Sequence, residues 1–111
     1  MLTSRISKAL FPKILKEGRN FNAPNLSLRI LRRSDDGPSA FSFVVAAKTA
    51  PKATRRNFLK RRGRHVIKKN LEGIKGGHYG VFFFKSGAVS LPFPAFEQEI
   101  LNSLKQARMV Q

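Results

Sequence analysis

The spacing of apolar positions changes several times along the chain, and each change predicts a new element. Over 8–17, Phe11 and Ile14 fall at helical spacing, and Gly18 follows as a stop signal. Pro12 would cost a backbone hydrogen bond anywhere beyond the first helical turn. We therefore expect a regular helix only from about Phe11, with a looser turn before it.

Two later stretches alternate apolar and polar residues, which is the pattern of half-buried strands. They cover 25–33 and 40–47, and the turn-forming sequence SDDGPS occupies 34–39 between them. This short spacing predicts that the two strands pair as an antiparallel hairpin. A weaker signal over 20–23 allows one further strand.

The second half of the chain has the pattern of a helix, a strand and a helix. The first helix is predicted from Thr54, a suitable N-cap, to about Asn70. Gly63 lies on its apolar stripe, where it would let the backbone approach a sheet closely. Residues 79–84 are almost continuously apolar, as expected for a central strand covered on both faces. A second amphipathic helix runs from about 94 to 108.

These elements predict an α+β fold in the order helix, two or three strands, helix, strand, helix, with one sheet and the helices packed on it. The chain has 111 residues, of which 41% are hydrophobic, and this is enough for one domain with a real core. We expect that single domain to span 1–111, with 1–7 and 109–111 poorly ordered.

Charge is the feature that points to function. The chain has 22 Lys and Arg against 6 Asp and Glu, a formal net charge of +16, and no acid lies between Asp36 and Glu72. Such a charge predicts a polyanionic partner, with nucleic acid first. A solvated surface face and a membrane-surface or nucleoid protein are less favoured interpretations, because the run has no acidic partners and much of the chain is strand-forming. The run comprises Lys48, Lys52, Arg55, Arg56, Lys60, Arg61, Arg62, Arg64, Lys68 and Lys69.

On the predicted basic helix, Arg56, Lys60 and Arg64 recur at every fourth position. Residues four apart on a helix lie about 6 Å from each other, which is near the spacing of phosphates along a strand. Like charges at this distance repel each other unless an anion neutralises them. Asn57 lies beside the row and can contact a base edge or a 2′-hydroxyl.

The polypeptide has no recognisable catalytic constellation. It lacks cysteine, which excludes a thiol nucleophile, a disulfide and a cysteine-based zinc site. Asp35 and Asp36 belong to a turn, and His65 and His78 are the only histidines. We expect neither catalytic nor metal-binding residues in the protein. No apolar run approaches the roughly 18 residues of a membrane span, so we expect a cytoplasmic protein without a membrane partner.

The sequence VVAAKTAPKATRRNFLKRRGR, in the basic run, resembles the signature of the bacterial ribonuclease P protein component. Lys48 matches a loop lysine of that family. Arg56 and Asn57 match the first two residues of its arginine-asparagine-arginine motif. Phe58 stands at the third position instead of a cation, and Arg55 is the alternative source of that charge. The order of the flanking elements also resembles the family's.

The resemblance implies the accessory protein subunit of an endoribonuclease. In that enzyme the RNA subunit hydrolyses the phosphodiester, with Mg²⁺ bound mainly by the RNA. The protein would bind ribonuclease P RNA and the 5′ leader of precursor tRNA, with no obligate protein partner. A structural RNA-binding protein of the ribosomal type remains the alternative.

The resemblance also implies a small α/β sandwich of order α-β-β-β-α-β-α. This fold has one mixed sheet and a left-handed crossover around the basic helix, although such crossovers are generally right-handed. One sheet face, with the first helix, would form a cleft in which aromatic rings stack on leader bases and an arginine meets phosphate. The sequence pattern does not decide which face is open.

Two sets of site residues follow from the charge pattern and the resemblance. The residues expected to contact the RNA subunit are Lys48, Lys52, Arg55, Arg56, Asn57, Lys60, Arg61 and Arg64. The residues assigned to the leader cleft are Phe11, Arg29, Phe41 and Phe43.

Overall fold

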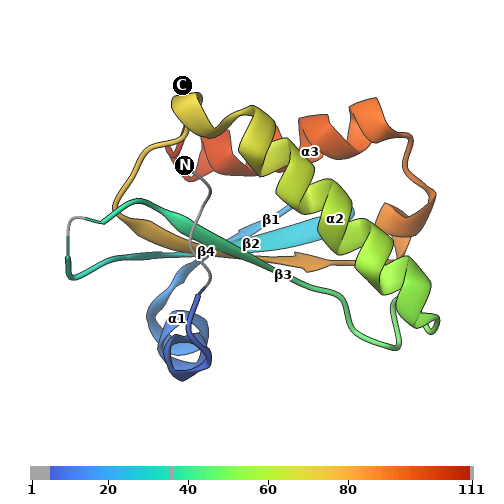
Figure 1. The fold of residues 1–111 in the computed structure, drawn as a ribbon, viewed down its shortest axis with the longest axis horizontal. Coiled ribbons are helices and arrows are strands. Elements are labelled where there is room, and N and C mark those ends of the chain that lie inside the picture. Colours follow the sequence, from blue (N-terminus) through green and yellow to red (C-terminus); the bar gives the residue numbers. More distant parts are fainter. Residues whose placement is uncertain (1–5, 36, 111) are drawn as a thin grey trace.

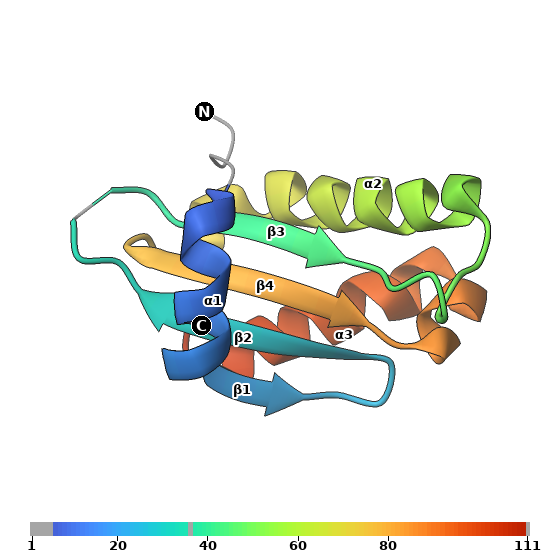
Figure 2. The same cartoon turned by 90° about the horizontal axis from the view of Figure 1, so that it is seen from below.

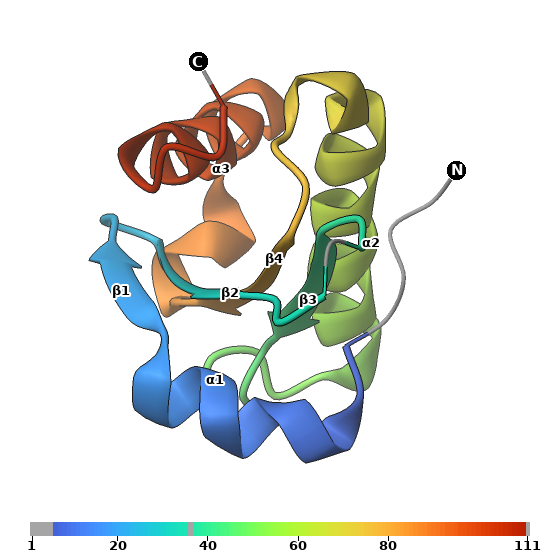
Figure 3. The same cartoon turned by 90° about the vertical axis from the view of Figure 1, so that its left-hand side faces the viewer.

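A four-stranded sheet separates one short helix from two longer helices (Figure 1). The computed structural model describes residues 6–35 and 37–110. Helix α1 (Phe11–Glu17) crosses one face of the sheet alone. Helices α2 (Ala53–Lys69) and α3 (Phe93–Gln106) lie side by side over the other face (Figure 3). The predicted α+β sandwich with one mixed sheet is confirmed.

The strands do not all pair as the sequence predicted. Their order in the sheet is β1-β2-β4-β3, with β4 antiparallel to β2 and parallel to β3. The predicted hairpin between 25–33 and 40–47 is therefore wrong, because β4 lies between these strands. β4 is apolar on both faces. Such a strand is favoured in the interior of a sheet, where other elements cover both of its faces. The bounds are β1 (Arg19–Asn22), β2 (Leu26–Arg32), β3 (Ala40–Val44) and β4 (His78–Phe84).

Helix α2 connects two neighbouring parallel strands, β3 and β4. Seen from the α1 side, the two strands run in the same direction and α2 passes behind them (Figure 2). In Figure 2 both arrows point to the right and β4 lies below β3. When this view is turned so that the arrows point up, β4 lies to the right of β3, and because α2 is behind the sheet the crossover is left-handed. The general preference for right-handed crossovers would have predicted the opposite hand. The hand implied by the resemblance is confirmed.

Alternation along the strands divides the apolar core into two clusters. The larger cluster, beneath α2 and α3, includes Phe43 and Phe82. The smaller cluster, beneath α1, includes Ile14 and Val81. Strand β4 contributes to both, which confirms its prediction as a central strand covered on both faces.

The two ends of the domain are packed into these clusters. Ile6 is buried under α1, and Met109 is buried with the larger cluster. Poor order was expected at both positions, and this expectation stays a prediction. The same expectation for 1–5 and 111 lies outside the described residues.

The starts of the helices reflect local backbone chemistry. A 3₁₀ turn capped by Ser7 precedes α1, so Pro12 falls in the first helical turn as predicted. Helix α2 begins with an extended Lys52 as its N-cap, so the prediction of Thr54 as the cap is wrong. The Lys52 carbonyl already accepts the first helical hydrogen bonds, which places Thr54 inside the first turn.

Candidate nucleic-acid interface

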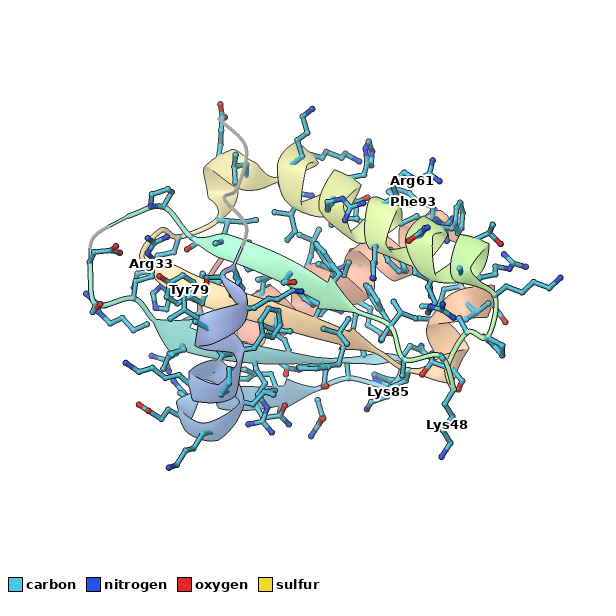
Figure 4. The ribbon with its side chains drawn as sticks, turned by 60° about the horizontal axis from the view of Figure 1, so that its bottom comes forward. Arg33, Lys48, Arg61, Tyr79, Lys85 and Phe93 are labelled. Atoms are coloured by element: carbon cyan, nitrogen blue, oxygen red, sulfur yellow. The ribbon has the colours of Figure 1, made fainter. Side chains whose placement is uncertain are left out.

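Helix α2 buries one stripe and exposes a cationic surface. Leu59 and Gly63 lie on the buried stripe, and Gly63 packs against the Phe43 ring of β3, as its predicted role required. On the opposite side, Arg61 projects outward (Figure 4). The exposed residues of the predicted set on this helix are Arg55, Asn57, Arg61 and Arg64.

Carboxylates do not neutralise this surface. Within the described residues, the only ion pair of α2 joins Lys69 to Glu97, with 3.2 Å between Nζ and Oε2. Lys60 and Arg64 have no carboxylate partner among these residues. Their charges therefore remain available to an external anion such as a phosphate.

Arg56 ties the loop after β3 to the start of α2. Its Nη1 donates to the carbonyl oxygens of Ala50 and Pro51, at 2.8 and 2.9 Å. The loop that carries Lys48 and Lys52 is thereby held against the helix. The remaining N–H groups of the guanidinium can still reach a phosphate, because arginine has five such donors.

The cationic surface continues from α2 to one end of the sheet. Lys48 and Lys52 are exposed in the loop that follows β3, and Lys85 is exposed directly after β4. Because β3 and β4 are parallel, these segments leave the sheet at the same end, where Figure 4 shows Lys48 and Lys85. Lys85 was not among the predicted residues. It had no distinguishing sequence signal, because its place depends on strand pairing.

Arg62 belongs to the basic run but faces inward. Its guanidinium carbon lies 4.8 Å from the Phe58 ring centroid and 5.3 Å from that of Phe93, and its Nη1 donates to the Leu91 carbonyl at 3.1 Å. Arg62 thus fixes α2 to the segment that leads into α3. Phe58, at the third position of the arginine-asparagine-arginine motif, is therefore a packing partner of Arg62.

The α1 side of the sheet carries a row of residues beyond the helix. Asn22, Ser27, Phe83 and Val44 are cross-strand partners, so their side chains share one face. Helix α1 crosses nearer the other end of the strands (Figure 2). Phe83 and Val44 pack against the small cluster and remain half-buried.

Two of the residues assigned to the leader cleft lie on this α1 side. Phe11 is half-buried in the small cluster. Arg29 donates from Nη1 to the Leu15 carbonyl at 2.6 Å, which ties the last turn of α1 to β2. Both residues therefore lie on the α1 side of the sheet, and their contact with a leader stays a prediction.

Phe41 and Phe43 do not join Phe11 and Arg29. They are only 6% and 8% exposed and lie under α2, on the opposite face of the sheet. Neither ring has an open surface for a base, so their assignment to a cleft beside α1 is corrected. On the α1 side, β4 contributes the rings of Tyr79 and Phe83. The alternation of residues along a strand predicts that its two faces differ, but it does not predict which face packs against α1.

Arg33 contrasts with the unpaired cations of α2. Its side chain bonds to the Asp35 carboxylate and lies over the Tyr79 ring (Figure 4), 4.8 Å from the centroid. The hydrogen bond from Arg33 holds the pKa of Asp35 below its ordinary value, and the backbone N–H of Gly37 adds to this effect. The Arg33 charge is thus balanced locally, unlike the charges of Lys60 and Arg64 on α2.

The structure offers little for metal or membrane chemistry within residues 6–35 and 37–110. No group of three or more His, Cys, Asp or Glu side chains gathers there as a metal site would require. Across the same residues, none of the helices has the length and apolarity needed to cross a bilayer.

Comparison with known proteins identifies the relatives of this chain. The family model described as Ribonuclease P matches residues 4–108. A ribonuclease P protein component from Microcystis aeruginosa is 30% identical over 103 residues, which cover 90% of this chain and 86% of the relative. The structure of the Thermotoga maritima ribonuclease P protein is 27% identical and superposes with a TM-score of 0.84, covering 93% of this chain and 96% of that one. The Staphylococcus aureus protein, 19% identical, shares the fold with a TM-score of 0.87 over 96% of this chain and 97% of that one.

Proposed function

This chain belongs to the ribonuclease P protein family and is a protein subunit of that endoribonuclease, and we propose that α2 is the surface that docks on its RNA subunit. The observation that carries this proposal is the carboxylate-free cationic side of α2, where Lys60 and Arg64 have no ion-pair partner within the described residues. Their spacing suits successive phosphates.

The loop between β3 and α2 extends the proposed docking surface. Arg56 holds this loop through two carbonyl hydrogen bonds, so that Lys48 and Lys52 stand at the end of the helix. A preorganised loop loses less conformational entropy on binding than a mobile one. Arg56 therefore acts both as a cation and as the residue that positions its neighbours. The further members of the surface are Arg55, Asn57 and Arg61.

The α1 side of the sheet is the proposed site for the 5′ leader of precursor tRNA. Phe11 from α1 and Phe83 from β4 offer aromatic surface, and the Arg29 guanidinium bonds the Leu15 carbonyl in the last turn of α1. A single strand can stack its bases on such rings while a guanidinium meets its backbone. The two proposed surfaces lie on different sides of the sheet, which lets one protein contact both RNAs.

We assign bond cleavage to the RNA subunit, with Mg²⁺ held mainly by RNA. The described side chains do not offer a carboxylate cluster that fits a magnesium site. The role of this chain is then to place the leader and to screen phosphate repulsion close to the metal-binding RNA. Because its proposed partners are the RNAs of tRNA maturation, we propose the cytoplasm as its location.

A tethered-probe experiment tests both surfaces directly. The chain has no cysteine, so single-cysteine variants can carry an iron chelate that cleaves nearby RNA. In the holoenzyme with precursor tRNA, a probe at Lys68→Cys on α2 should cleave the RNA subunit. A probe at Lys13→Cys on α1 should cleave the leader. The matched control is Gln98→Cys on the exposed side of α3, which should cleave neither. An α2 probe that leaves the RNA subunit intact would exclude docking through α2.

A further inference from the structure

Phe58 is an exposed aromatic ring on the most cationic helix of the protein. Phe58 is 41% exposed, and Leu15 is the other large apolar residue of the described chain with comparable exposure. Exposing a phenylalanine forgoes the free energy of burying its ring. The family signature has a cation at this position, so the Phe58 ring distinguishes this chain from the signature.

The ring is supported on one side. The Arg62 guanidinium lies over it at 4.8 Å, and that guanidinium is itself held by the Leu91 carbonyl and packed over Phe93. Arg62 is half-buried, so it cannot swing freely into solvent. Phe58 is thus backed by a fixed arginine, while much of its remaining surface is open.

The positive charges around the open side of the Phe58 ring favour an anionic partner. Arg55 and Arg61 lie three residues before and after Phe58 and are therefore its neighbours on the helix surface. Both are exposed, and neither forms an ion pair within the described part of the chain. An apolar partner would leave these two charges without compensation. A nucleic-acid strand offers a flat base for the ring and phosphates for the flanking arginines.

We propose that the open side of Phe58 is a stacking platform for one unpaired base of the RNA subunit, an inference that rests on the proposed docking of α2. Every base has an aromatic face, so the contact tolerates different bases but requires an unstacked one. A loop or bulge of the RNA is the expected source. The contact replaces a salt-dependent phosphate contact with one that depends little on salt.

The absence of tryptophan from the chain allows a direct test. Phe58→Trp places the only tryptophan at the platform, and binding of the cognate ribonuclease P RNA should quench its emission. Leu15→Trp, at the other exposed apolar position, is the matched control, and its emission should not respond to the RNA subunit alone. Phe58→Tyr should bind like the unmodified protein. Phe58→Leu, which keeps an apolar contact with Arg62, should bind about 5- to 150-fold more weakly, as expected for one lost stack.

The outcomes separate this inference from the proposed function. If the RNA binds tightly but the emission from Phe58→Trp is unchanged and Phe58→Leu binds normally, the platform is wrong while α2 docking stands. If Phe58→Tyr and Phe58→Leu lose affinity equally and both lower the melting temperature, the ring is only a packing partner of Arg62. If the unmodified protein does not bind the RNA, both proposals fail.

Discussion

The Cβ atom that Gly63 lacks would lie 2.5 Å from Cε1 of Phe43. Helix α2 therefore approaches β3 as closely as it does only because this position has no side chain. The Phe43 ring has little room to move, because it is stacked on Phe82 at 5.3 Å and on Phe84 at 6.0 Å. This packing fixes the height of the cationic helix above the sheet.

Gly63→Ala should destabilise the protein although alanine favours helix. Overpacking costs about 1–3 kcal/mol, and the close approach to a stacked ring favours the upper half of that range. The higher helix propensity of alanine offsets about 1 kcal/mol of this cost. We expect a net loss of about 1–2 kcal/mol, measured as a lower urea midpoint at unchanged slope. Gly73→Ala is the control, because no heavy atom lies within 4 Å of its added Cβ. Equal midpoints for the two variants would contradict the close-approach role.

Lys60→Ala and Arg64→Ala should flatten the salt dependence of binding to the RNA subunit. Each removes one proposed phosphate contact, so the slope of log affinity against log salt should fall by about 0.7–0.9 per variant. Filter binding over a range of salt concentrations measures this slope. Lys105→Ala, in the last turn of α3, removes the same charge elsewhere and should change the slope much less. Slopes that stay equal in all variants would remove Lys60 and Arg64 from the interface.

Arg56→Lys should affect the loop as well as the charge. Lysine keeps the positive charge but cannot reproduce the geometry of a guanidinium that bonds both Ala50 and Pro51. We expect weaker RNA binding at nearly unchanged salt slope, with faster amide hydrogen exchange at Ala50, whose N–H bonds to the Ala46 carbonyl. Arg64→Lys, at a position without such carbonyl bonds, is the control. Unchanged exchange at Ala50 would mean that Arg56 does not organise the loop.

Phe11→Ala should weaken the holoenzyme's binding of precursor tRNA more than that of mature tRNA. The expected difference is about 1–3 kcal/mol, the contribution of one base stacked on an aromatic ring. Phe11 also packs in the small cluster, so Phe11→Leu serves as a variant that keeps most of the packing. It should keep the melting temperature and still lose the preference for the leader. Equal losses for both tRNAs would reduce Phe11 to a packing residue.

The Asp35 carboxyl should titrate below the usual value near 3.9. The lowered pKa comes first from the Arg33 side chain and then from the Gly37 backbone N–H. The ionised Asp35 carboxylate stabilises the native loop at pH values above the unfolded-state pKa. This stabilisation is lost as the pH falls through the lower folded-state pKa. Carbon NMR titration of Asp35 measures the shift directly. Arg33→Lys, which cannot form the same paired hydrogen bonds, should move the pKa back towards 3.9, and an unmoved pKa would exclude Arg33 as its main cause.

Local features of this fold were predictable from sequence, whereas partner choice between distant elements was not. The start of α1 follows from Pro12, and the burial of Gly63 follows from its stripe on α2. The pairing of β3 with β4 was missed, because a turn signal shows that a chain reverses but not that another strand will enter the gap. The same limit hid the positions of Phe41 and Phe43, since alternation separates two faces without naming what covers each.

The predicted cationic set also shows what charge patterns can and cannot indicate. The sequence identified the basic helix, and carboxylates leave most of its exposed cations unpaired within the described chain. It could not show that Arg62 packs over Phe93, because that contact depends on where α3 begins relative to α2. It could not show that Arg56 holds the loop, because the carbonyls of Ala50 and Pro51 carry no sequence signal.

Cleavage of a precursor tRNA by the cognate ribonuclease P RNA at limiting Mg²⁺, with and without this protein, tests the central claim most directly. We expect the protein to increase the rate of 5′ cleavage at the mature end, and we expect a double variant, Lys60→Ala with Arg64→Ala, to lose most of that increase while remaining folded. Tight RNA binding without any increase in cleavage would contradict a role in the ribonuclease P reaction and would favour a purely structural RNA-binding protein.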